Sequence, residues 1–149
     1  MTEIILFQPE IPQNTGNIAR TCAATGSSLT LVRPLGFSLS SRWVKRAGLD
    51  YLDKVEIKLV DSLEAYLQEK ETFYFFSTKA KIPYSEIRFN HEAALIFGSE
   101  SAGLPSSIHT RWPDRFYTIP MRPSIRSLNL SNAASIVLYE ALKQNGFAL

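Results

Sequence analysis

Every residue is apolar or aromatic in two short stretches, Phe73-Tyr74-Phe75-Phe76 and Ala94-Leu95-Ile96-Phe97. Continuous runs of this length are typical of β-strands that are buried on both faces of a sheet. Such strands occur mainly in parallel sheets that carry helices on each side. The two stretches therefore predict an α/β fold with a mostly parallel sheet and helices on both of its faces.

The rest of the chain alternates between strand-like and helix-like segments, as this fold requires. A helix capped at Asn14 is expected to run to about Thr25, because Gly26 can end it in the left-handed conformation. Another is expected to open at Asp61, whose spacing to Glu64 resembles a capping box. The expected strands are 4–7, 29–32, 55–60, 73–76, 94–97 and 116–119. Two more helices are expected. One is short and basic, begins at a cap formed by Ser40 or Ser41 and stops at Gly48, and the other spans 131–145.

The composition indicates a single globular domain over residues 1–149. Hydrophobic residues make up 45% of the chain and charged residues 20%, and a chain of this length can bury a sizeable core. The net charge of +2 neither requires nor excludes a nucleic-acid partner.

No metal site or membrane segment is expected. Cys22 is the only cysteine, and the only histidines, His91 and His109, are interpreted as ordinary polar or partly buried residues. No stretch approaches the roughly 20 apolar residues that cross a bilayer, and the first residues lack the basic region of a signal peptide. We expect a cytoplasmic protein.

Three polar segments follow expected strands: Gln8–Arg20, Gly98–Pro105 and Pro120–Asn132. In parallel sheets, ligands bind beyond the C-terminal ends of the strands. The first segment places two asparagines and Arg20 around a helix start, which suits an anionic group such as a phosphate. The alternative is an ordinary capped helix with a surface arginine.

The other two segments also allow two interpretations each. Gly98 and Gly103 bracket Glu100, and glycine allows a ligand to approach the backbone closely, although a structural turn would use the same residues. The loop is not a phosphate-binding Walker loop, because Leu104 and Pro105 stand where Lys and Ser or Thr are required. The last segment holds more hydroxyl and amide side chains than one helix cap needs, but a capped loop remains the alternative.

Three stretches together resemble the SPOUT class of RNA methyltransferases: FQPEIPQNTGNIARTCAATG (7–26), IFGSESAGLP (96–105) and IPMRPSIRSLNLSNAASIVLYEAL (119–142). Within this class, the chain resembles the small single-domain, TrmL-like branch. The stretch RAGLDY (46–51) also resembles this branch. The resemblance implies a deep trefoil knot in the C-terminal part, a homodimer, and S-adenosylmethionine bound in the knot. The implied reaction is 2′-O-methylation of the ribose of the wobble nucleotide, cytidine or modified uridine 34, in the anticodon stem-loop of tRNA, with leucine isoacceptors expected and no DNA partner.

The resemblance also implies roles for individual residues. Arg20 is expected to orient the reacting groups and stabilise charge rather than accept a proton, because a guanidinium is effectively always protonated. The family often has a basic residue where Ser101-Ala102 stands here. The implied cofactor-binding residues are Phe76, Gly98, Ile119 and Ser127, and the implied catalytic residues are Asn14, Arg20, Glu100, Ser127 and Asn129.

Two further features concern partners. Arg42, Lys45 and Arg46 share one helical face beside Trp43, which suits RNA phosphates, although a solvated helix face is the alternative. The helix 131–145 is too apolar for a helix with one solvent-exposed face, so it is either buried in the fold or forms the dimer contact. The resemblance to the family implies that it does both.

Two other functions remain open from the sequence. One is a 2′-O-methyltransferase for another tRNA position or for ribosomal RNA. The other is a nucleotide-binding or RNA-binding module without catalysis.

Overall fold

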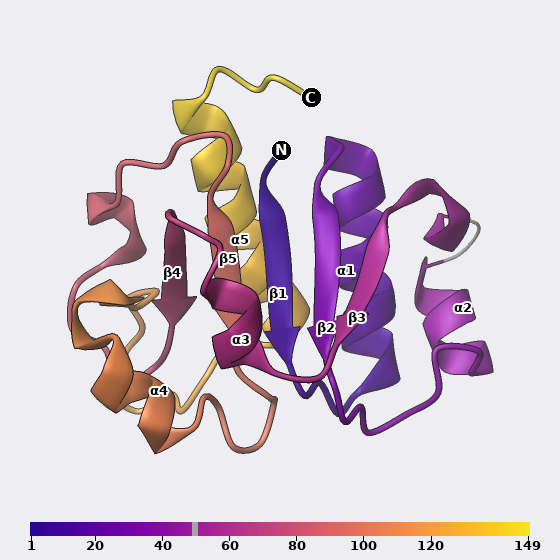
Figure 1. The fold of residues 1–149 in the computed structure, drawn as a ribbon, viewed down its shortest axis with the longest axis horizontal. Coiled ribbons are helices and arrows are strands. Elements are labelled where there is room, and N and C mark those ends of the chain that lie inside the picture. Colours follow the sequence, from indigo (N-terminus) through magenta and orange to yellow (C-terminus); the bar gives the residue numbers. More distant parts are fainter. Residues whose placement is uncertain (49–50) are drawn as a thin grey trace.

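The computed structural model describes residues 1–48 and 51–149. Within these residues, the strands form one six-stranded sheet of order β3-β2-β1-β5-β4-β6, and all of its pairings are parallel (Figure 1). This confirms the predicted parallel α/β sheet. The strands are β1 (Glu3–Phe7), β2 (Ser28–Val32), β3 (Ile57–Val60), β4 (Phe73–Phe76), β5 (Ala94–Phe97) and β6 (Phe116–Tyr117).

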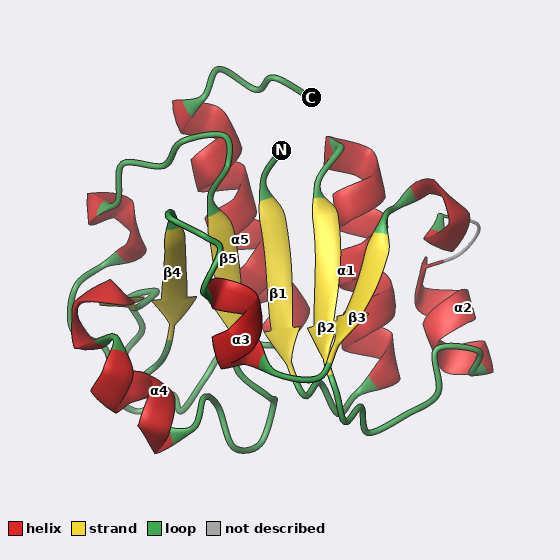
Figure 2. Cartoon of the chain, in the orientation of Figure 1, coloured by secondary structure: helices red, strands yellow, loops and turns green. Residues whose placement is uncertain are grey.

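Helices cover both faces of the sheet. The long helices α1 and α5 lie behind it in Figure 2, α3 and α4 lie in front, and α2 lies beside α1 at one edge. The helices are α1 (Pro12–Thr25), α2 (Arg42–Gly48), α3 (Leu63–Leu67), α4 (Ser106–Arg111) and α5 (Leu130–Gln144), with 3-10 turns η1 (Leu52–Lys54), η2 (Tyr84–Glu86) and η3 (Pro113–Arg115).

The two-sided burial explains the continuous apolar strands. In β5, Leu95 and Phe97 belong to the core shared with α1 and α5, whereas Ala94 and Ile96 belong to the core shared with α3 and α4. Successive side chains of a strand point to opposite faces, so each position of β5 needs an apolar residue. The same alternation holds in β1, where Ile5 faces the second core.

Helix α1 begins two residues before its predicted cap. Ile11 precedes the helix and makes no side-chain capping hydrogen bond, while Pro12 occupies the first turn, where its missing N–H is no loss. Asn14 therefore lies inside the helix and is buried. Its side chain does not cap the helix and instead lines the pocket at the C-terminal edge of the sheet.

Other boundaries differ from prediction as well. Ser62 caps α3 in place of Asp61: the Ser62 hydroxyl accepts a hydrogen bond from the Ala65 N–H at 3.2 Å, and Asp61 instead pairs with Arg33. The strands β3 and β6 are shorter than expected. Leu49 and Asp50 of the RAGLDY stretch lie outside the described residues.

Helix α5 has one buried face and one mixed face. Ala134, Val137, Leu138 and other small or apolar residues are buried against the sheet. On its outer side, Ile136 is 38% exposed and Tyr139 is 45% exposed. In the described parts of the chain, neither α5 nor any other helix has the length and hydropathy to cross a membrane.

Candidate active site

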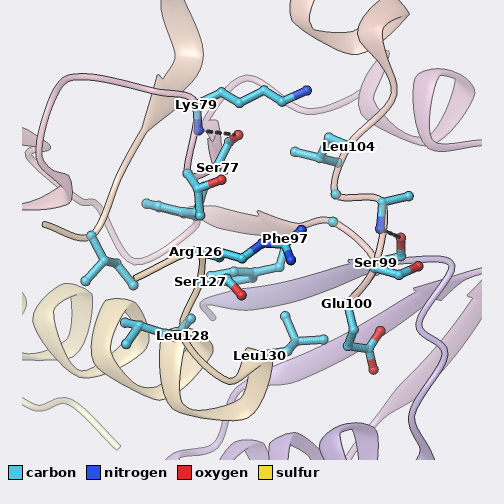
Figure 3. A pocket seen from close by; sticks show the side chains of 18 of the residues that line it. Ser77, Lys79, Phe97, Ser99, Glu100, Leu104, Arg126, Ser127, Leu128 and Leu130 are labelled. Carbon is cyan, nitrogen blue, oxygen red and sulfur yellow. Dashed lines mark hydrogen bonds between the residues drawn. The ribbon is translucent and has the colours of Figure 1, made fainter. Parts of the chain in front are cut away.

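An open pocket of about 890 Å³ lies at the C-terminal edge of the sheet. It is formed by the segments that follow β1, β4, β5 and β6, together with the start of α5 (Figure 3). This volume is within the range of small-molecule and cofactor sites. Its apolar wall includes Phe76, Phe97, Leu104, Ile119, Leu128 and Leu130.

The pocket brings together most of the residues that the sequence singled out. All four expected cofactor-binding residues line it, and so do the expected catalytic residues Asn14, Glu100, Ser127 and Asn129. Arg20 is not part of the lining. It is exposed, and its guanidinium lies 5.4 Å from the ring centre of Tyr51.

Two asparagines and a carboxylate join the three segments at the pocket floor. The Asn14 amide donates to Glu100 Oε2 at 3.2 Å, and Asn14 Oδ1 accepts a hydrogen bond from the Asn129 amide at 3.0 Å. Asn129 also caps α5, because its Oδ1 accepts hydrogen bonds from the N–H groups of Ser131 and Asn132 at 2.9 and 3.2 Å. Each of these side chains therefore positions a different segment of the pocket.

The loops after β1 and β5 are locked to each other by reciprocal hydrogen bonds. Glu100 accepts from the N–H groups of Glu10 and Ile11 at 2.9 and 2.8 Å. Glu10 in turn accepts from the Ser101 hydroxyl at 2.6 Å and its N–H at 3.0 Å, and these two bonds lower the pKa of Glu10. Gly36 lies behind the first loop, where a Cβ would come within 2.9 Å of Glu10 Cα.

We expect Glu100→Gln to weaken this lock. The substituted amide keeps one acceptor oxygen, but its NH₂ group faces N–H donors, and losing hydrogen bonds to a charged group typically costs about 1.5–3 kcal/mol. Urea unfolding should therefore show a loss of about 2 kcal/mol. Glu69→Gln, the same change at an exposed carboxylate, is the control. Equal stability of the two variants would contradict this role of Glu100.

The glycine turn after β5 is unusually close-packed. Gly98 begins it, and the Ser99 and Gly103 backbones bond to each other at 3.2 and 2.9 Å. A Cβ on Gly98 would lie 2.2 Å from the Gly103 carbonyl carbon and 2.5 Å from the Leu104 nitrogen. Real Cβ atoms do not approach backbone so closely, so only glycine fits at position 98.

The pocket also contains residues that sequence reasoning missed. His109, from α4, stands in its wall and stacks on Phe116 with ring centres 4.0 Å apart. Burial, with a smaller contribution from the Lys79 charge, lowers the pKa of His109, which favours a neutral imidazole. Ser77 and Thr78 also line the pocket. A lone histidine in a short polar helix gives no signal for this position.

The charge of the pocket is set by few side chains. The positively charged residues of its lining are Lys79 and Arg126. Figure 3 shows Arg126 extending across the pocket toward Phe97. Glu100 is its carboxylate and already accepts three hydrogen bonds. Among the residues that the structure describes, no cluster of three or more His, Cys, Asp or Glu side chains could hold a metal ion.

Comparison with known proteins identifies relatives over almost the whole chain. The SpoU rRNA Methylase family matches residues 1–139. A tRNA (cytidine(34)-2'-O)-methyltransferase of Aeromonas hydrophila is 45% identical over 99% of this chain and 97% of its own length.

Solved structures agree with the sequence relatives. A structure described as giving insights into the 2-OH methylation of C/U34 on tRNA superposes with a TM-score of 0.92 at 45% identity, covering 98% of this chain and 97% of that one. The AviRb methyltransferase of Streptomyces viridochromogenes in complex with AdoMet superposes with a TM-score of 0.82 at 25% identity, covering 96% of this chain and 57% of that one.

Proposed function

We propose, from the premise that this chain belongs to the SpoU rRNA Methylase family, that it methylates the ribose 2′-oxygen of nucleotide 34 in tRNA with S-adenosylmethionine as methyl donor. The observation that carries the proposal is the convergence of all three motif segments on one pocket in a chain whose full-length relatives are named for this reaction. The expected tRNA substrates are leucine isoacceptors, and the proposed location is the cytoplasm.

The residues of the pocket fit an S-adenosylmethionine molecule. Apolar side chains such as Phe76, Phe97 and Ile119 offer a surface for a purine ring, and exposed Ser127 and Asn129 offer polar groups for the ribose and the amino-acid part. When bound, the donor supplies an activated methyl carbon on a sulfonium. Phe76, Gly98, Ile119 and Ser127 are the residues that we propose to hold it.

The chain's own residues position the reaction. Methyl transfer would form a bond between the 2′-oxygen and the methyl carbon as the carbon–sulfur bond breaks, and the products would be a 2′-O-methyl ribose, S-adenosylhomocysteine and the proton released from the 2′-oxygen. Asn14, Glu100 and Asn129 fix the floor on which the two reactants meet, Ser127 contributes a hydroxyl there, and such positioning can supply much of the rate.

Arg20 lies outside the lining of the pocket in its own chain. Arg20 follows Asn14 by six residues on α1, about 9 Å along the helix axis, and its guanidinium lies over Tyr51 rather than in its own pocket. We propose a homodimer in which Arg20 of one protomer reaches the pocket of its partner. There its charge would orient the ribose or an adjacent phosphate and stabilise the developing negative oxygen.

The exposed apolar side chains of α5 support this dimer. Ile136 and Tyr139 lie on the side of α5 that faces away from the core. Ile136→Asp should convert the dimer to monomer in sedimentation equilibrium and should reduce methyl transfer, because an uncompensated charge is costly to bury at an interface. A variant that remains dimeric would show that the contact lies elsewhere. Ile82→Asp, the same change at another exposed isoleucine, is the control.

We propose that the C-terminal part of the chain forms a deep trefoil knot. The pocket forms where the segment after β6 runs from Ile119 to the start of α5, beside the loops after β4 and β5. A knot would hold these segments together without a disulfide, and Cys22, the cysteine of the chain, is buried in the core. We also propose that residues 1–149 form one methyltransferase domain.

RNA is proposed to approach over the basic side of α2. Arg42, Lys45 and Arg46 are all exposed, and α2 has no acidic residue in its first turn. Binding of an anticodon stem-loop should weaken steeply with salt, and replacing all three residues with alanine should lower the slope of log K against log salt by about 2. Filter binding at several salt concentrations measures this. An unchanged slope would exclude α2 from the RNA-binding surface.

Labelled methyl transfer tests the proposed function. Bulk tRNA from a strain that lacks the gene should accept label from S-adenosylmethionine, whereas the same tRNA from the parent strain should accept little. Label in ribosomal RNA alone would support the alternative substrate, and no label in either RNA would support a non-catalytic module.

A further inference from the structure

Two exposed aromatic side chains come from α2 and from the residue before η1, and both of these elements pack against α1. Figure 1 shows α2 beside α1 at one edge of the fold. Trp43, in α2, is 40% exposed, and Tyr51, just before η1, is 37% exposed. The next residue along the chain is anchored in each case, because Val44 is fully buried and Leu52 packs against the main core. The two rings therefore remain at the surface on an anchored support.

A positive side chain lies against each ring. The Arg42 guanidinium carbon is 4.8 Å from the ring centre of Trp43. Arg20 approaches the Tyr51 ring to 5.4 Å, and Lys54 approaches it to 6.0 Å. Arg20 comes from α1, so two separate segments contribute. We call Arg20, Arg42, Trp43, Tyr51 and Lys54 the aromatic platform.

This combination has a specific chemical preference. Aromatic rings and guanidinium planes stack with nucleobases, and the adjacent positive charges attract phosphates. In an RNA duplex the base faces are hidden inside the helix, so only unpaired nucleotides can use the rings. A surface for duplex phosphates alone would need the cations without exposed aromatic rings.

The platform lies next to a catalytic pocket in the proposed dimer. Arg20 of the platform is the α1 residue that we place at the pocket of the partner protomer, so the platform of one protomer borders the pocket of the other. We propose that the aromatic platform stacks unpaired bases of the RNA loop that carries the target nucleotide, with Trp43 as the principal stacking residue. This rests on the proposed function and adds the requirement that the substrate present splayed loop bases to the protein.

Trp43 fluorescence tests the proposal in the full chain. Trp112→Phe leaves Trp43 as the sole tryptophan, and the phenyl ring keeps an aromatic contact with Phe73. An RNA hairpin with an unpaired loop should quench this fluorescence. The same hairpin with abasic loop nucleotides, and a blunt duplex of equal charge, should quench it little. Equal quenching by all three RNAs would overturn the proposal.

A second measurement does not depend on that variant. Trp43→Ala should weaken hairpin binding by about tenfold or more, as expected for the loss of one stacked base, and Trp43→Phe should restore most of it. Neither change should alter the affinity for S-adenosylmethionine. Wild-type methyl transfer with an unchanged RNA KM in Trp43→Ala would overturn the platform and leave the proposed function standing. Absence of methyl transfer by the wild-type protein would instead overturn the proposed function.

Discussion

Arg20→Ala should reduce methyl transfer by a factor of about a hundred or more while changing the affinity for S-adenosylmethionine by only a few fold. Removing one group that stabilises developing charge typically costs a factor of this size. Arg20 lies outside the pocket lining of its own chain, so its loss leaves the cofactor-binding residues in place. Single-turnover methyl transfer and calorimetry with the same protein measure the two quantities.

Two control variants define what Arg20 contributes. Arg20→Lys keeps the charge but loses the planar fork of donors, so it should recover only part of the activity. Arg88→Ala removes an exposed arginine from the loop that precedes β5, where its neighbours Ile87 and Phe89 bond to Gln144 of α5, and it should have little effect. Full activity in Arg20→Ala would remove Arg20 from the mechanism.

Gly98→Ala should abolish cofactor binding. The added methyl group would lie 2.2 Å from the Gly103 backbone, and because backbone atoms cannot rotate away, the turn after β5 must open. Opening the turn moves Glu100 and Ser101 away from the loop that they lock. We expect at least a hundredfold loss of affinity for S-adenosylmethionine and S-adenosylhomocysteine by calorimetry.

Gly146→Ala separates this effect from general instability. Gly146 has a positive φ of 71° at the end of α5, with nothing within 4 Å of its would-be Cβ. Alanine there costs about 1 kcal/mol of backbone strain but leaves the pocket untouched. Cofactor affinity should therefore be normal in Gly146→Ala. Normal affinity in Gly98→Ala would show that the turn tolerates a side chain and is not part of the cofactor site.

The fold was predictable because a strand that is buried on both faces has apolar residues at every position. β4 and β5 have no polar alternation, and this pattern alone indicates a parallel sheet between two helical layers. Helix starts were less predictable, because several polar residues near a start can each serve as a cap. Ser62 rather than Asp61 caps α3, and Asn14 lies inside α1, where its amide bonds to Glu100.

The site was predictable in its segments but not in its contacts. Polar residues after apolar strands indicated the pocket edge, and the resemblance indicated which of them to expect there. The lock between Glu10 and Ser101 joins residues 91 positions apart, and no local pattern encodes such a pair. His109 reaches the pocket only because α4 folds back over Phe116, which local sequence does not reveal.

Methylation of the nucleotide 34 ribose can be checked by mapping the product. Purified protein is incubated with S-adenosylmethionine and unmodified tRNA, and the RNA is then digested and examined by mass spectrometry. We expect one added methyl group, on the ribose of nucleotide 34. Methylation at any other nucleotide or on a base, or tRNA recovered unchanged, would contradict this expectation.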